Sequence, residues 1–123
     1  MTVSTHVLDA SAGRPAAGVS VTLSLLPSRP GGDWLDLESG ATDADGRYRF
    51  VAPTPPGVYR LVFGTGRYFA ARAVTTFYPE VTIAFTIAEP VAGEPAGADG
   101  KREAHFHVPL LLSPFAYSTY RGS

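Results

Sequence analysis

Apolar and polar residues alternate along most of the chain, with the period of a β-strand that has one face on a core. The alternation is cleanest in VSVTLSL, residues 19–25, and in VTIAFTI, residues 81–87, where every odd position is apolar. Gly, Pro and Asp separate the other β-rich runs, which are residues 3–8, 34–42, 47–51, 58–63, 105–112 and 115–120. The pattern predicts about eight strands.

One segment departs from the strand pattern and has helical character. This is TGRYFAARAV, residues 65–74, for which Thr65 is the expected N-cap. Short strands at regular spacing with one helix predict an all-β fold, an antiparallel β-sandwich. The segment EPVAGEPAGADGKRE, residues 89–103, is polar and rich in Pro, Gly and Ala, so we expect a loop between two strands there.

Composition narrows the class of protein. The 123 residues fit a single domain over residues 1–123, and the formal net charge of −1 gives no electrostatic footprint for nucleic acid or an anionic membrane. The absence of cysteine excludes a disulfide scaffold, a thiolate zinc site and a cysteine nucleophile. The start MTVSTHVLDA lacks the basic and apolar regions of a signal peptide, and no apolar run has the length of a membrane span. We therefore expect a cytoplasmic protein.

The candidate chemistry lies on the strand faces opposite the core. In HFHVPL the alternation turns Phe106 toward the core and both His105 and His107 away from it, side by side. By the same period His6 lies opposite Val3 and Val7, and Arg47 and Arg49 lie opposite Tyr48 and Phe50. All three histidines of the chain are thus predicted on non-core faces, next to apolar neighbours that face the core.

Three interpretations of these residues remain open from spacing alone. They can be ordinary side chains on the wet face of a sheet. His6, His105 and His107 can form a three-histidine zinc site with an open position, since His-x-His projects two imidazoles about 7 Å apart along a strand. They can also perform metal-free acid–base catalysis, with neutral imidazoles that activate water and Arg47 that binds an anionic substrate. No Gly-x-Ser-x-Gly elbow supports a covalent serine mechanism.

Several motifs resemble one known family in order along nearly the whole chain. They are STHVLD at 4–9, GRPAAG at 13–18, TDADGR at 42–47, FYPEV at 77–81 and HFHVPLLLSPFAYSTYRGS at 105–123. These residues resemble the transthyretin-related family of 5-hydroxyisourate hydrolases. The most diagnostic element is the final Tyr-Arg-Gly-Ser, which distinguishes the hydrolases from the thyroid-hormone carrier transthyretin.

The resemblance implies a transthyretin-like sandwich with one short helix, assembled as a homotetramer, a dimer of dimers with active sites along a channel. It implies hydrolysis of 5-hydroxyisourate to 2-oxo-4-hydroxy-4-carboxy-5-ureidoimidazoline in urate degradation, with no metal or organic cofactor. By position, the implied catalytic residues are His6, Arg47, His105 and His107. The implied substrate-binding residues are His6, Arg47, Tyr120, Arg121, Gly122 and Ser123.

The resemblance also suggests how these residues divide the work. His6 and one histidine of the pair would hold and deprotonate water, the other histidine would orient it or return the proton, and Arg47 would neutralise developing charge. The C-terminal residues would shape the pocket wall, and Tyr120 would add a hydrogen bond. Two rival functions are a carrier that binds an aromatic ligand in the channel and an adhesion-type sandwich module whose histidines are incidental or bind zinc.

Overall fold

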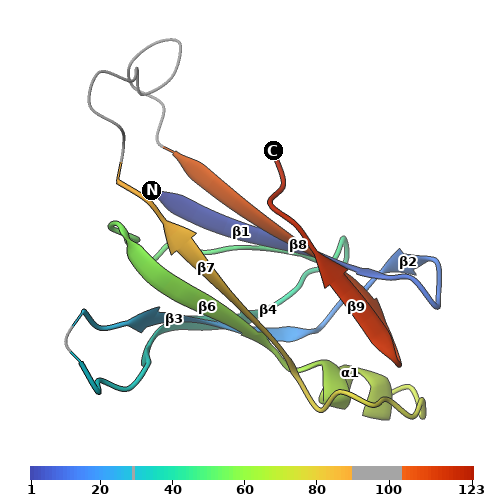
Figure 1. Cartoon of the computed structure of the whole chain (residues 1–123). Helices are drawn as coiled ribbons and strands as arrows, with labels where there is room; N and C mark the ends of the chain where they lie inside the picture. Colours follow the sequence, from blue (N-terminus) through green and yellow to red (C-terminus); the bar gives the residue numbers. More distant parts are fainter. Residues whose placement is uncertain (29, 90–103) are drawn as a thin grey trace.

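Two β-sheets lie face to face in the computed structural model, which describes residues 1–28, 30–89 and 104–123 (Figure 1). A short helix, α1 (Thr65–Ala70), lies at one end of the two layers. The first sheet contains β1 (Thr2–Asp9), β2 (Arg14–Pro15), β5 (Arg47–Arg49), β8 (His105–Ser113) and β9 (Ala116–Thr119). The second contains β3 (Ser20–Leu26), β4 (Leu35–Ala41), β6 (Gly57–Phe63) and β7 (Val81–Ile87). The predicted sandwich is confirmed.

The core lies between the sheets and follows the alternation of the sequence. In β1 every second residue is buried, and Val3 and Val7 are fully inaccessible. In β6 the same period buries Tyr59, Leu61 and Phe63 against them. Because side chains of a strand alternate between faces, the polar residues between these positions are left on the outer face of each sheet.

One strand pair adds a detail that the alternation did not predict. Among the described residues all strand pairs but one are antiparallel, whereas β1 and β8 run parallel, in register from Thr2 opposite His105 to Asp9 opposite Leu112. Nearly the whole chain separates these two strands, so no hairpin constrains their relative direction. The sheet orders β2-β1-β8-β9 and β4-β3-β6-β7 leave β9 and β7 as edge strands.

All eight predicted strands are present, with ends shifted by at most two residues. β5 ends at Arg49 rather than residue 51, and the two-residue β2 was not predicted because Arg14–Pro15 has no alternation. The predicted loop of residues 89–103 lies, apart from Glu89, outside the described residues.

The helix is shorter than its pattern predicts. It ends at Ala70 rather than residue 74, because Ala73 takes a left-handed conformation with φ of 56° and closes the last turn. Thr65 is not the N-cap: Gly64 holds that position without a side-chain cap, and the buried Oγ1 of Thr65 has no hydrogen-bond partner within the described residues. No helix in the described ranges is long and apolar enough to cross a membrane.

A buried carboxylate ties α1 to the first sheet. Asp9, at the end of β1, accepts hydrogen bonds from the hydroxyl of Tyr68 at 2.7 Å, from the backbone and hydroxyl of Ser11, and from the backbone of Ala12. Burial alone would raise the pKa of Asp9, but these hydrogen bonds outweigh it and hold the pKa below its usual value of 3.8. Burial and the Asp9 contact raise the pKa of Tyr68 to about 12. This link fixes the helix against the end of the strand that also carries His6.

We expect Tyr68→Phe to lower the free energy of unfolding at pH 7 by about 1.5–3 kcal/mol, the range for a hydrogen bond to a charged group. The loss should shrink as the pH falls below 3.8, because a group with a lowered folded-state pKa loses its stabilising effect when it is protonated. Denaturant unfolding at pH 7 and pH 3 measures both effects. Tyr78→Phe is the control, since the ring of Tyr78 contacts Phe77 and Tyr117 but its hydroxyl has no partner among the described residues. Equal losses in the two variants would contradict the role given to the Asp9 contact.

Candidate active site

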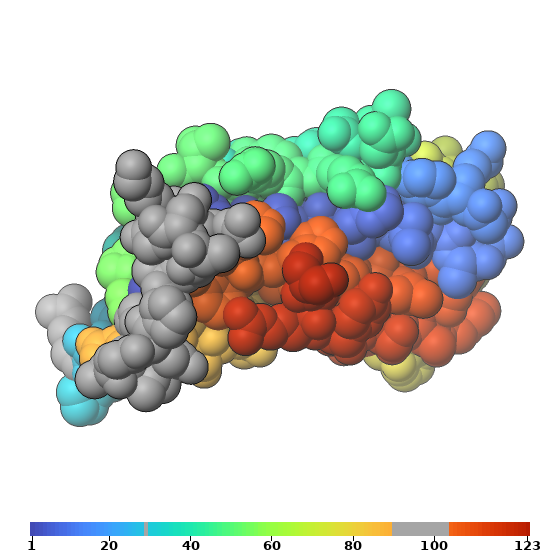
Figure 2. Space-filling view, turned by 90° about the horizontal axis from the view of Figure 1, so that it is seen from above, coloured from blue at the N-terminus to red at the C-terminus, as the bar shows by residue number. Residues whose placement is uncertain are grey.

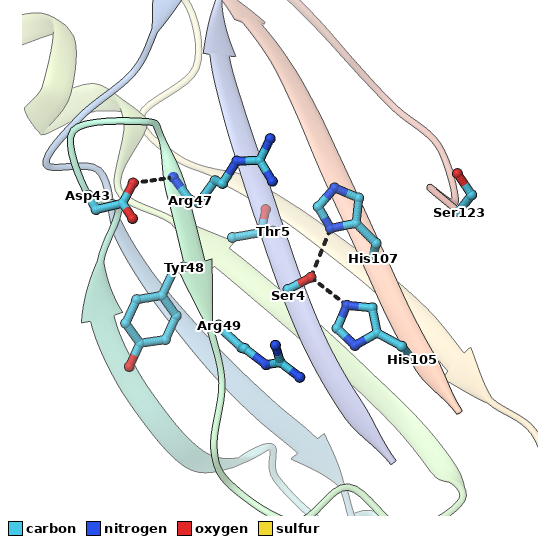
Figure 3. A pocket seen from close by; sticks show the side chains of 9 residues that line it. All are labelled: Ser4, Thr5, Asp43, Arg47, Tyr48, Arg49, His105, His107 and Ser123. Carbon is cyan, nitrogen blue, oxygen red and sulfur yellow. Dashed lines mark hydrogen bonds between the residues drawn. The ribbon is translucent and has the colours of Figure 1, made fainter. Parts of the chain in front are cut away.

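The outer faces of three neighbouring strands, β1, β5 and β8, surround a cavity of about 400 Å³ (Figure 3). β5 pairs with one side of β1 and β8 with the other, so residues from distant parts of the chain face one another. Figure 3 shows the arginine side chains of β5 extending toward the histidines of β8, across β1. The lining residues are Ser4, Thr5, Asp43, Arg47, Tyr48, Arg49, His105, His107 and Ser123.

Two hydroxyls of β1 hold the histidines of β8. The parallel register places Thr2 opposite His105 and Ser4 opposite His107. Thr2 Oγ1 lies 2.6 Å from Nδ1 of His105, and Ser4 Oγ lies 2.8 Å from both Nε2 of His105 and Nδ1 of His107. The two rings are stacked, with centroids 6.5 Å apart. Nε2 of His107 has no partner within the described residues and is the ring nitrogen left for a ligand.

His6 lies on the same face of β1 as Ser4, directly opposite Arg47 in the ladder with β5. Its Nε2 lies 2.9 Å from the carbonyl oxygen of Asp45. A carbonyl oxygen can only accept, so Nε2 of His6 carries a proton and donates it to this carbonyl. His6 does not line the cavity itself, but its charge is close enough to influence His107.

A tight turn before β5 sets the position of Arg47. Asp43 Oδ1 accepts hydrogen bonds from the backbone N–H of Asp45 and of Arg47, both at 2.9 Å. Gly46 has φ of 77°, and a side chain there would collide with the backbone carbonyl of Val7 in β1. Gly46 of the Asp-Gly-Arg sequence therefore allows the turn to lie close against β1, and this places the following Arg47 at the cavity.

The cavity disfavours positive charge on His107. Burial lowers its pKa below 6.5, and the nearby charges of His105, His6 and Arg47 lower it further, while hydrogen bonding at Ser4 acts in the opposite direction. His107 is therefore neutral at pH 7, with Nε2 available as an acceptor or donor according to tautomer.

The last residues of the chain fold back onto β8 (Figure 2, red on orange). Gly122 forms an antiparallel bridge with His107, its N–H donating to the carbonyl of His107 at 2.8 Å. A Cβ at Gly122 would lie 2.5 Å from Cδ2 of the His107 ring, so only glycine fits this approach. The guanidinium of Arg121 lies over the ring of Phe106, 4.7 Å from its centroid, and Ser123 reaches the cavity. The end of the chain is therefore part of the site and not a free tail.

The structure gathers four of the eight predicted site residues around one cavity: Arg47, His105, His107 and Ser123. His6 and Gly122 contact or adjoin these residues, whereas Tyr120 and Arg121 line a separate apolar pocket of about 250 Å³ on the other side of β8. Sequence reasoning missed Ser4, Thr5, Asp43 and Tyr48 as lining residues, and it placed Arg49 on the non-core face without assigning it to the site. For Ser4 the signal was present, because the period of two places it on the face of His6.

The zinc alternative finds no support in the described ranges. There, no group of three or more His, Cys, Asp or Glu side chains is placed to hold a metal ion. The nitrogens of His105 are both taken by β1 hydroxyls, and Nε2 of His6 is taken by a carbonyl.

Comparison with known proteins identifies the family. The family model described as the HIUase/Transthyretin family matches residues 3–122. The chain belongs to this family. A mouse relative named 5-hydroxyisourate hydrolase is 42% identical over 124 residues, which cover 98% of this chain and 94% of the relative.

Two solved structures represent the two branches of the family. The Klebsiella pneumoniae 5-hydroxyisourate hydrolase is 39% identical, covers 100% of both chains and superposes with a TM-score of 0.75. Transthyretin from Sparus aurata is 29% identical, covers 98% of this chain and 95% of its own, and has a TM-score of 0.78. The fold is thus shared with a hydrolase and with a transthyretin alike, and the site must distinguish them.

We expect the ring of His107 to titrate below pH 6.5, and Arg47→Gln to raise its pKa by removing one of the charges that disfavour the imidazolium. Proton NMR of the imidazole resonances across pH 4–9 (about five units, to bracket the His range) measures both. Because the folded-state pKa is lowered, the unfolded chain binds this proton more strongly, and stability should fall as the pH drops below 6.5. Arg67→Gln, at an exposed position of α1, is the control. A His107 titration above pH 6.5, or an Arg67→Gln shift as large as that of Arg47→Gln, would contradict this electrostatic account.

Proposed function

We propose that the protein is a hydrolase that opens 5-hydroxyisourate with water, giving 2-oxo-4-hydroxy-4-carboxy-5-ureidoimidazoline in urate degradation. The observation that carries the proposal is the cavity itself, in which the final Ser123 meets His105, His107 and Arg47. By the family resemblance, the terminal Tyr-Arg-Gly-Ser that contains Ser123 distinguishes the hydrolases from the carrier transthyretin. The mouse and Klebsiella relatives are both named 5-hydroxyisourate hydrolase, which supports the hydrolase function.

Water activation is assigned to His107. Its neutral ring faces the cavity, and Nε2 is the nitrogen free to accept a proton from water. The deprotonated water attacks a ring carbonyl of the substrate, the carbon–nitrogen bond of the cyclic amide breaks, and the proton returns to the leaving nitrogen. His105 contacts the same Ser4 hydroxyl as His107 and is assigned to the acid–base group with it. His6, which lies opposite Arg47 in the pairing of β1 with β5, is assigned to this group as well.

Charge stabilisation is assigned to the arginines. Arg47 faces the histidines across β1, where it can neutralise charge that develops on the attacked carbonyl oxygen or on an acidic ring nitrogen. Asp43, the carboxylate that also lines the cavity, is engaged by two backbone N–H groups of its own turn. The cavity is suited to an anionic substrate, since Arg47 and Arg49 both line it and neither forms an ion pair within the described residues.

Substrate positioning is assigned to the terminal tetrapeptide with His6 and Arg47. Gly122 and Arg121 anchor the segment on β8 through the His107 bridge and the Phe106 ring. This anchoring holds Ser123 at the cavity wall, where its hydroxyl can bond a substrate oxygen or nitrogen. Tyr120 is 59% exposed and belongs to the apolar pocket on the other side of β8, so its part in binding is the least direct of the four.

The proposal includes assembly of the single domain, residues 1–123, into a homotetramer in the cytoplasm. Two edge strands, β7 and β9, have an unpaired side among the described residues and can pair with a second copy. Large apolar side chains near these strands are open to solvent in the single chain, including Phe77 at 72% and Phe115 at 66% exposure. Such surfaces are typical of interfaces between subunits.

The test of activity follows the ultraviolet decay of 5-hydroxyisourate formed in place by urate oxidase. We expect the full chain to accelerate this decay and to retain its rate after EDTA treatment, because no step requires a metal. His107→Asn and Arg47→Gln should each lower kcat/KM about 100-fold or more, the scale of lost acid–base or oxyanion stabilisation. A chain that ends at Thr119 should lose activity, because Ser123 and the bridge to His107 are removed.

The control variant is Arg67→Gln, which changes a charge on α1 outside the cavity. If 5-hydroxyisourate decays no faster with the intact chain than without it, the hydrolase proposal is wrong and a carrier of an aromatic ligand is favoured. If EDTA abolishes activity and added zinc restores it, the alternative of a zinc-dependent site is favoured instead.

We expect sedimentation to give a mass of about four times the 13.0 kDa of the single chain at micromolar concentration. Introducing lysine at Phe77 should lower that mass, since a charge replaces an exposed apolar side chain at the expected contact. Lysine at Ala44, an exposed position in the turn before β5, is the matched control. A monomer in the unmodified protein would rule out the tetramer.

A further inference from the structure

A continuous row of polar side chains joins β1 to β8 at the floor of the cavity. It runs from Thr2 through His105 and Ser4 to His107, with three contacts of 2.6–2.8 Å. Figure 3 shows the two contacts that Ser4 makes. Ser4 is the centre of the row, since its single hydroxyl contacts Nε2 of one ring and Nδ1 of the other. The oxygen of a serine can donate one hydrogen bond and accept two, so it can donate to one histidine while it accepts from the other.

This arrangement couples the tautomers of the two rings. When Ser4 donates to Nε2 of His105, Nδ1 of His107 must carry a proton and donate to Ser4, which leaves Nε2 of a neutral His107 unprotonated. When Ser4 donates to Nδ1 of His107 instead, Nε2 of His107 carries the proton. The direction of one hydroxyl therefore decides whether the ring nitrogen that faces the cavity acts as a base or as an acid.

We propose that Ser4 is a positioning residue that relays a proton between His107 and His105 during hydrolysis, a role that rests on the hydrolase function proposed above. Nε2 of His107 takes a proton from water, and Nδ1 passes its own proton to Ser4 Oγ. The hydroxyl proton of Ser4 moves at the same time to Nε2 of His105, which becomes the imidazolium and donates through Nδ1 to Thr2.

The second half of the reaction reverses the relay. Nε2 of the now neutral His107 gives its proton to the leaving nitrogen of the substrate, while His105 returns a proton through Ser4 to Nδ1 of His107. Each proton is accounted for, and both rings end in their starting tautomers. The same nitrogen thus serves first as base and then as acid, and the extra proton resides on His105.

The surroundings of the two rings favour this direction of transfer. His105 is exposed to solvent, so water can stabilise its positive charge, whereas His107 is half-buried. The lowered pKa of His107 reflects the same burial together with the neighbouring cations. The charged or titratable groups that face the pair are Arg47 and Arg49 from β5 and Asp43 from the preceding turn, and His6 of β1 is close enough to act on His107.

The test compares Ser4→Ala with Ser4→Thr in the full chain, using the 5-hydroxyisourate decay. Alanine removes the relay atom, and we expect kcat to fall about tenfold to 100-fold with KM changed less than about twofold, because a proton-transfer step is lost. Threonine keeps the hydroxyl and suits a strand, so it should retain kcat within about threefold. Ser39→Ala is the matched control, since Ser39 also shares a cross-strand hydroxyl contact, 2.8 Å from Thr22, outside the cavity.

A second measurement, the dependence of kcat on the deuterium content of the solvent, distinguishes a proton relay through Ser4 from a structural role of Ser4. In mixtures of H2O and D2O, kcat of the unmodified protein and of Ser4→Thr should depend on deuterium fraction along a curve, because at least two protons move together. Ser4→Ala should give a straight line. Its acid limb of kcat should also move to higher pH, since the proton left on His107 can no longer pass to His105.

Each result has one meaning. Inactive unmodified protein overturns the hydrolase function and the relay together. Active protein with a Ser4→Ala variant that keeps kcat and the curved isotope dependence overturns the relay alone. A Ser4→Thr variant as slow as Ser4→Ala, or a Ser4→Ala loss confined to KM, also overturns it, because the hydroxyl would then act only through packing or binding.

Discussion

The parallel pairing of β1 with β8 is the constraint on which the rest of the site depends. Its register is fixed from the core side, where Val3 and Val7 of β1 and Leu110 of β8 are fully buried between the sheets. Because side chains alternate with a period of two, a slip of one residue would turn these apolar groups to solvent and the polar face to the core. The same pairs that fill the core therefore hold Ser4 beside His107 and Thr2 beside His105. The hydroxyls and imidazoles of the site need no further interaction to fix their relative positions, because burial of the apolar residues already fixes the register of the two strands.

Around this strand pair the cavity combines a neutral base with several cations. His107 stays uncharged because it is half-buried and faces Arg47 and two other histidines, an arrangement that suits proton transfer at neutral pH. Asp43 shapes the turn that delivers Arg47, because its Oδ1 accepts hydrogen bonds from two backbone N–H groups of that turn. The position of Arg47 at the cavity is thus a consequence of these local hydrogen bonds.

The fold itself is neutral with respect to function, since a hydrolase and a transthyretin superpose on it about equally well. Function must therefore be argued from the side chains of the site, which in this chain lie on the outer face of the first sheet. Here the final residues return to that face through the bridge between Gly122 and His107, and the glycine is required because a Cβ would meet the imidazole ring. A segment that would be a mobile tail on most domains becomes one wall of the cavity.

The sequence by itself determined the strands, the faces of the histidines and arginines, and, through the resemblance, the family. These features depend on local alternation and on residue order, which any strand expresses in its own few residues. Tertiary structure decided what depends on partners distant in sequence. It set the parallel direction of β1 against β8 and placed Ser4 in contact with both histidines of β8. It also moved Tyr120 and Arg121 to a different pocket from Ser123, although they are neighbours in the chain. Alternation specifies which face a side chain occupies, but only the packed core specifies which strand lies beside it and in what register.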